Sequence, residues 1–129
     1  MKPNINGAMS DIYEALKKTC NLVGRLQTAF HDTNNGMVSN VLQGLYEELE
    51  TVRRRMMVIP DGVFRTYVEG LLLPLGHVTR KFEQLSESFE LIGNKKVAGS
   101  FDTFAASLRN IQDQLESLVE QVETMKGEY

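Results

Sequence analysis

The spacing of apolar residues is the feature that most constrains how this chain of 129 residues folds. In four segments apolar side chains recur at alternating intervals of three and four residues, which places them along one stripe of an α-helix. The first stripe runs from Met9 to Phe30, the second from Val38 to Ile59 and the fourth from Phe101 to Met125. Since no segment alternates apolar and polar residues as a half-buried strand does, the sequence predicts an all-α protein.

The third stripe is the longest, and it contains a proline. Its members are Phe64, Val68, Leu71, Leu75, Val78, Phe82, Leu85, Phe89 and Ile92. The stripe passes Pro74 without losing its phase. Because a proline inside a helix removes one backbone hydrogen bond and crowds the preceding turn, we expect the third helix to kink or to split at Pro74.

Turn-forming residues separate the four stripes. Pro60 and Gly62 interrupt the chain after the second stripe, and the glycine-bounded residues 93–99 follow the third, with Ser100 as the expected N-cap of the last helix. These signals predict one domain with helices at about 8–31, 37–59, 62–92 and 100–126. Short connections favour an antiparallel four-helix bundle, although two extended hairpins or a shared bundle in a dimer would leave the same pattern. The two halves share the heptad spacing but no residue motif, so no duplicated unit is predicted.

Composition restricts the class of protein further. A net charge of −3 gives no general attraction to nucleic acid or anionic lipid. The longest apolar run, residues 71–75, is too short for a transmembrane helix, and the first residues lack the apolar core of a signal peptide. The single cysteine, Cys20, cannot form an internal disulfide and lies beside the first stripe, where we expect a small buried hydrophobe. The sequence therefore predicts a cytoplasmic protein.

Catalytic and metal-binding patterns are not apparent. The stripes contain no Asp, Glu or His, and neither His31 nor His77 belongs to a Glu-x-x-His pair of the kind that binds metals in helical bundles. No serine or cysteine is placed beside a histidine base. We therefore expect no enzymatic activity, no metal, no cofactor and no small-molecule substrate.

Arg53, Arg54 and Arg55 form the strongest basic cluster. The helical register places all three away from the core, near the end of the second helix, where Glu50 can pair with Arg53 and Arg54. A solvated, internally paired face is the simplest interpretation. The alternatives are electrostatic docking to an acidic partner or to nucleic-acid phosphates, and the second is weaker because no aromatic residue alternates with the arginines to stack on a base.

The third helix carries more apolar residues than one stripe requires. In residues 70–77, Leu73 lies on the side opposite Leu71 and Leu75 and shares that side with Gly70 and His77. Three interpretations are open. The other three helices enclose this segment, or it is a docking surface for a partner or a second copy, or it is a groove for a membrane surface or a small ligand. The predicted partner-binding residues are Tyr67, Gly70, Leu72, Leu73 and His77.

These patterns favour a non-enzymatic helical protein–protein interaction module, such as an adaptor, a chaperone or an assembly subunit. We expect it to self-associate as a homodimer through the apolar surface of the third helix. Two alternatives remain, namely a nucleic-acid-associated accessory protein that uses Arg53, Arg54 and Arg55, and a ligand-binding helical bundle.

Overall fold

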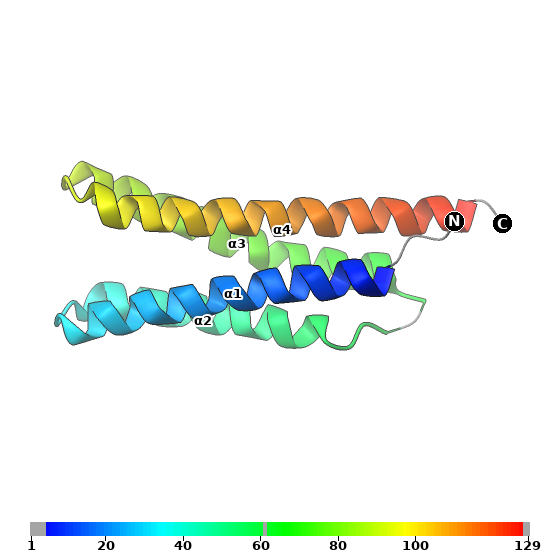
Figure 1. The fold of residues 1–129 in the computed structure, drawn as a ribbon, viewed down its shortest axis with the longest axis horizontal. Coiled ribbons are helices and arrows are strands. Elements are labelled where there is room, and N and C mark those ends of the chain that lie inside the picture. Colours follow the sequence, from blue (N-terminus) through cyan, green and yellow to red (C-terminus); the bar gives the residue numbers. More distant parts are fainter. Residues whose placement is uncertain (1–4, 61, 128–129) are drawn as a thin grey trace.

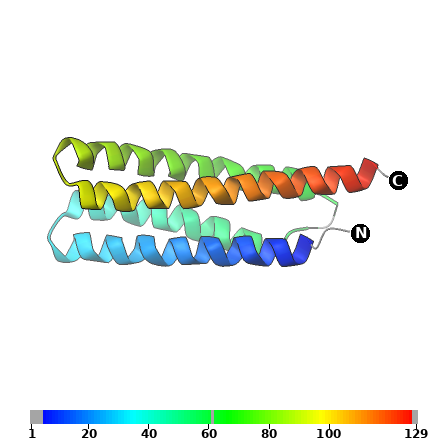
Figure 2. The same ribbon diagram turned by 45° about the horizontal axis from the view of Figure 1, so that its top comes forward.

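Four helices form an antiparallel bundle, as the sequence predicts. A computed structural model describes residues 5–60 and 62–127. The helices are α1 (Ile5–Asp32), α2 (Gly36–Met56), α3 (Phe64–Leu91) and α4 (Lys95–Gly127). Neighbours along the chain pack side by side, and α1 also packs on α4, which closes the bundle (Figures 1 and 2). No helix in the described part of the chain is both long enough and apolar enough to cross a bilayer.

The predicted stripes meet along the bundle axis and form its core. Leu16, Leu49, Leu75 and Leu108 are fully buried, one from each helix. Phenylalanine rings fill the end of the core next to the α1–α2 and α3–α4 turns, where the ring of Phe82 lies 5.4 Å from Phe104 and 6.1 Å from Phe101 between centroids. These offset and edge contacts add to the stabilisation that apolar burial provides.

Helix α3 continues through Pro74. It is one helix from Phe64 to Leu91 with the proline inside it, so the chain does not split there, and a kink stays a prediction. Ile92 was predicted to belong to the core, but it is 74% exposed, because α3 ends at Leu91 and the chain turns away from the core. The side chain of Met125, the last member of the fourth stripe, lies outside the described residues.

Three helix boundaries differ from the prediction by three residues or more. Helix α1 begins at Ile5 and not at about residue 8. Helix α4 begins at Lys95, and the Ser100 hydroxyl donates to the Lys96 carbonyl inside the helix instead of capping its start. Asn94 is the cap, since its side-chain oxygen accepts a hydrogen bond from the Val97 amide at 3.2 Å. Helix α2 ends at Met56 and not at Ile59.

The two hairpin turns are built alike. In the α3–α4 turn Gly93 has φ of +83°, and the amides of Gly93 and Asn94 donate to the carbonyls of Glu90 and Phe89. In the α1–α2 turn Asn34 has φ of +61°, and the amides of Asn34 and Asn35 donate to the carbonyls of His31 and Phe30. Each turn is a Schellman motif followed directly by an asparagine N-cap, because Asn35 accepts from Val38 as Asn94 does from Val97.

The two hairpins also correspond position by position, although the sequence predicted no duplicated unit. Helices α1 and α3 are both 28 residues long. When the two hairpins are aligned with Phe30 matched to Phe89, buried residues of the first correspond to buried residues of the second. The pairs are Ile12 and Leu71, Leu16 and Leu75, Val23 and Phe82, Leu42 and Phe101, Leu49 and Leu108, and Met56 and Leu115. The corresponding core residues are mostly different apolar types, so the two halves share no residue motif although their helices correspond.

The second helices of the hairpins differ in length. Helix α2 has 21 residues and α4 has 33. Beyond Leu115, the counterpart of Met56, α4 continues to Gly127, which corresponds to about 18 Å of helix. After Met56 the chain leaves the helix before Pro60, and Gly62 has φ of +81°. A non-helical connection therefore follows the end of α2, while α4 extends well beyond that level (Figure 1).

We predict that Phe82→Ala lowers the free energy of unfolding by about 3–5 kcal/mol, because it removes a fully buried ring from the aromatic cluster. Ile92→Ala, an exposed apolar control, changes it by less than about 0.5 kcal/mol. Urea denaturation followed by circular dichroism measures both values. Similar losses for the two variants would contradict the assignment of the core.

Candidate functional site

The predicted docking surface on α3 is largely in contact with α2. The Tyr67 hydroxyl donates a hydrogen bond to the Arg55 carbonyl at 2.8 Å, and the Arg55 guanidinium lies 5.3 Å from the centre of the Tyr67 ring. A β-carbon at Gly70 would lie 3.4 Å from Nη2 of Arg55. The Arg55 side chain therefore lies beside Tyr67 and Gly70 while it stays exposed to solvent.

The remaining predicted residues separate into different environments. His77 Nδ1 lies 3.1 Å from both carboxylate oxygens of Glu48 on α2, and Leu72 is half-buried against the core. The sequence suggested that Gly70 and His77 face away from the bundle. In the structure α2 lies beside that side of α3, so both residues lie next to α2 side chains. Leu73 is the exposed apolar member of the predicted set, with 77% of its surface exposed, and the His77 side chain is 50% exposed beside Glu48.

Arg53 does not project into solvent as predicted. Its Nη1 donates to the Tyr13 hydroxyl on α1 at 2.6 Å, and its Nε donates to Oε2 of Glu50 at 3.0 Å. The side chains of Arg53 and Glu50 are only 21% and 16% exposed. The hydrogen bond to Glu50 raises the pKa of Arg53 above its already high ordinary value. Arg53 thus joins α1 to α2, which is a structural role.

Arg54 and Arg55 are left as the outward-facing arginines of the cluster. Arg54 is exposed, and its Nε donates to the Glu50 carbonyl at 3.3 Å. Neither arginine forms an ion pair with any carboxylate whose side chain the structure describes. Their positive charge is therefore not neutralised by a local contact, so an acidic group can approach it.

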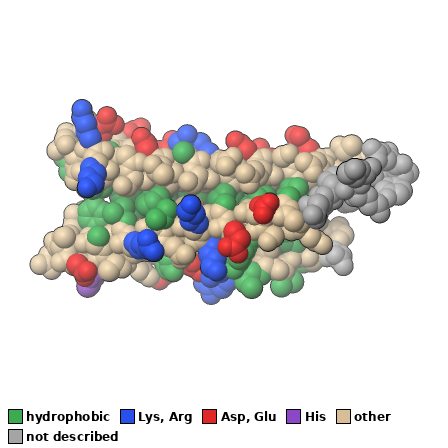
Figure 3. Space-filling view, in the orientation of Figure 1, with side chains coloured by type: hydrophobic (Ala, Val, Ile, Leu, Met, Phe, Trp, Pro, Cys, Tyr) green, Lys and Arg blue, Asp and Glu red, His purple; other side chains and the backbone are tan. Residues whose placement is uncertain are grey.

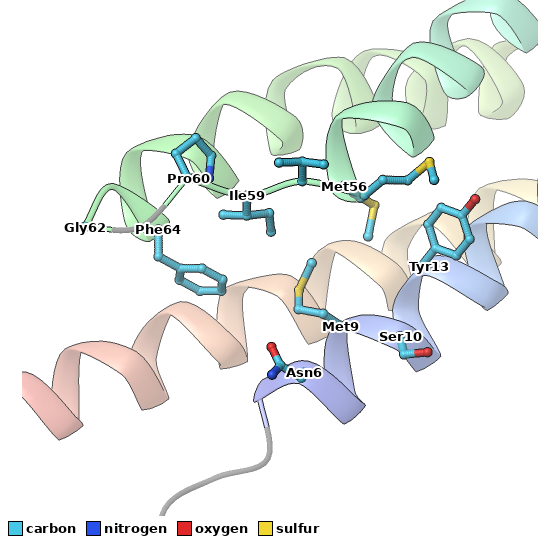
Figure 4. Close-up of a pocket in the computed structure, with 11 residues that line it drawn as sticks. Asn6, Met9, Ser10, Tyr13, Met56, Ile59, Pro60, Gly62 and Phe64 are labelled. Atoms are coloured by element: carbon cyan, nitrogen blue, oxygen red, sulfur yellow. The ribbon is translucent and has the colours of Figure 1, made fainter.

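A groove that the sequence did not predict lies where α2 ends. It has a volume of about 710 Å³ and is formed by the first turns of α1, the end of α2, the connection and the start of α3 (Figure 4). We call it the end groove. Its lining residues are Asn6, Met9, Ser10, Tyr13, Met56, Met57, Val58, Ile59, Pro60, Gly62 and Phe64.

The end groove is mainly apolar. Figure 4 shows Met9, Ile59 and Phe64 turned toward one space from α1, the connection and α3. At the surface Met57 and Val58 are 64% and 76% exposed. The space-filling view shows hydrophobic side chains next to Lys and Arg side chains at this edge of the molecule (Figure 3). Methionine side chains are flexible and polarisable, so such a lining can adapt to differently shaped apolar groups.

The lining offers little for catalysis. Among the described residues of the lining, the Tyr13 phenol is the one titratable side chain, and its hydroxyl accepts a hydrogen bond from Arg53. The described residues contain no group of three side chains that could hold a metal ion. The sequence signal for the groove is the run of apolar residues 56–59 before Pro60, although helical spacing alone predicts the end of a helix there.

Cys20 is a buried, free thiol at the α1–α2 interface. Burial, followed by the charge of Glu50, raises its pKa from 9.0 to about 12. The thiol therefore stays protonated at neutral pH, and a protonated thiol is a poor nucleophile.

We predict that Arg53→Ala lowers the free energy of unfolding by about 1–3 kcal/mol, because it leaves Glu50 and Tyr13 without their partner. Arg54→Ala, one residue further along the same helix, changes it by less than about 0.5 kcal/mol because that side chain is exposed. Chemical denaturation of both variants measures the difference. Equal effects would contradict the structural role of Arg53.

We predict that the Cys20 thiol reacts with Ellman's reagent at pH 8 at least about a hundredfold more slowly in the native chain than in the denatured chain. Rapid labelling of the native chain would contradict the burial of Cys20.

The raised pKa of the Cys20 thiol, about 12 in the folded chain, also lowers the free energy of unfolding as pH rises from 9.0 toward 12, since only the unfolded thiol loses its proton in that window. The stability of wild type should accordingly fall more than that of Cys20→Ala over this range.

Comparisons of the chain with protein-family models, with curated proteins and with solved structures gave no match. The function must therefore be inferred from the fold, the end groove and the neighbouring charges.

Proposed function

We propose that this chain is a non-enzymatic helical protein–protein interaction module, acting as an adaptor, a chaperone or an assembly subunit. The observation that carries the proposal is the end groove, an apolar depression of about 710 Å³. Its rim leaves Met57 and Val58 largely exposed to water. Burying such side chains against a partner is favourable, and clustered exposed apolar groups are typical of association sites.

The chemistry of the lining supports binding over catalysis. Backbone and apolar side chains make up most of the described lining of the end groove, and its polar side chains are those of Asn6, Ser10 and Tyr13. General acid–base catalysis requires a side chain that is free to exchange a proton with the substrate, whereas the Tyr13 hydroxyl already accepts a hydrogen bond from Arg53. An apolar segment of another protein is the better match. A single buried thiol is also compatible with a reducing, cytoplasmic setting.

Self-association through α3 is a second candidate, and it rests on Leu73. This leucine is 77% exposed inside α3, nine residues after the helix begins at Phe64. In a homodimer it would be covered by the second copy. The nucleic-acid alternative has less support, because Arg53 is held by Glu50 and Tyr13, and two exposed arginines on a chain of net charge −3 neutralise few phosphates.

We predict that Met57→Glu abolishes recovery of a specific partner when the tagged chain is purified from its host, because it places a charge at the rim of the end groove. Leu73→Asp keeps that partner, and sedimentation velocity shows whether it changes a dimer into a monomer. Circular dichroism confirms that both exposed-site variants remain folded. If wild type and Met57→Glu recover the same proteins, the end groove is not the docking site. A wild type that recovers no partner and sediments as a monomer would contradict the proposed function.

A further inference from the structure

We propose that the end groove binds an acidic amphipathic helix, which takes the position that α2 leaves vacant after Met56. This inference rests on the proposed function, since it specifies the partner chemistry of the same groove. It follows from two independent observations, the correspondence between the hairpins and the position of the arginines.

The hairpin correspondence identifies a helix as the fitting shape. Beyond Leu115 helix α4 continues over the start of α1, where Leu118 is buried and lines the same small hollow as Ala8 and Ile12. Helix α2 has no such continuation, because it ends at Met56. On that side Met9 and Phe64 remain half-buried, with the connection beside them. A helical segment placed there would cover them as α4 covers the other side of α1, which is the helix-in-groove mode of recognition.

The arginines identify the charge of the partner. Arg53 contacts Tyr13, which lines the end groove, and Arg55 covers Tyr67, which lies one turn after Phe64. The three consecutive arginines therefore lie around the end of α2, directly before Met56. Arg53 is already paired with Glu50, whereas Arg54 and Arg55 have no carboxylate partner among the described side chains. Glutamates or aspartates beside the apolar stripe of a docked helix would meet these two charges.

The shape of the groove favours a peptide helix over a membrane surface. Met9, Ile59 and Phe64 line a hollow between elements, so a flat bilayer would not reach them, whereas the side chains of a helix would (Figure 4). The net charge of −3 also opposes attraction of the whole chain to anionic lipid.

The test uses the full chain and a synthetic peptide of about 18 residues with leucine at alternating three- and four-residue spacing and glutamate or glutamine elsewhere. A second peptide replaces each glutamate with lysine. We expect the acidic peptide to bind with a Kd on the order of micromolar and the lysine peptide to bind at least about tenfold more weakly, as measured by fluorescence anisotropy.

Matched variants locate the site. Replacing Arg54 and Arg55 with glutamine should weaken binding of the acidic peptide by about tenfold, and Met57→Gln should weaken it by about fivefold or more. Arg80→Gln and Met37→Gln are the controls, because both side chains are exposed and lie toward the opposite end of the bundle. The controls should leave the Kd unchanged.

Four results would overturn the inference, and they differ in what they say of the proposed function. If both peptides bind equally and Met57→Gln weakens both, the groove docks apolar helices without charge selection, so the proposed function stands. If the chain binds neither peptide but still recovers a Met57-dependent partner, the partner has another chemistry. Peptide binding that Met57→Gln and the arginine variant leave unchanged would place the site elsewhere. If only vesicles of phosphatidylserine and phosphatidylcholine bind, the proposed function fails as well.

Discussion

Each of the four apolar stripes is removed from water only where neighbouring helices pack against it, and the rest of the structure depends on this constraint. Where all four helices run together, residues such as Leu16 and Leu108 are fully buried. The requirement is not met beyond Met56, where α2 ends and α1, α3 and α4 continue. Pro60 and Gly62 lie in the connection that replaces the helix there. The end groove is the surface that this shorter helix leaves incompletely covered.

Polar contacts between the helices fix how each hairpin is aligned. The Gln27 side chain donates to the Ser39 hydroxyl at 3.0 Å in the first hairpin, and the Ser86 hydroxyl donates to the Ala98 carbonyl at 3.0 Å in the second. These two contacts occupy corresponding positions, close to the asparagine-capped turns. Because a buried polar group without a partner is costly, such pairs disfavour sliding of one helix along the other. In the described part of the chain every buried side-chain polar atom has a partner.

The sequence predicted the four helices and most of the core because helical periodicity is a local property. It misplaced the start of α4, since residues 93–99, with a glycine at each end and two lysines, resemble a loop, while the Asn94 cap and the buried Ala98 stabilise a helix there. The lateral contacts of Arg53 and His77 depend on where a neighbouring helix lies, which spacing along one chain does not specify. The end groove was missed for the same reason, because it is formed by three separate segments and by the early end of α2.

Methyl NMR of the methionines tests the central claim most directly, because the chain carries its own reporters. Met9, Met56 and Met57 line the end groove, whereas Met37 is exposed at the opposite end of the bundle. On titration of ¹³C-methyl-methionine-labelled chain with the acidic amphipathic peptide, we expect the resonances of the three groove methionines to shift together and that of Met37 to stay in place. Shifts at Met37 alone, or at no methionine while the peptide binds, would contradict docking in the end groove.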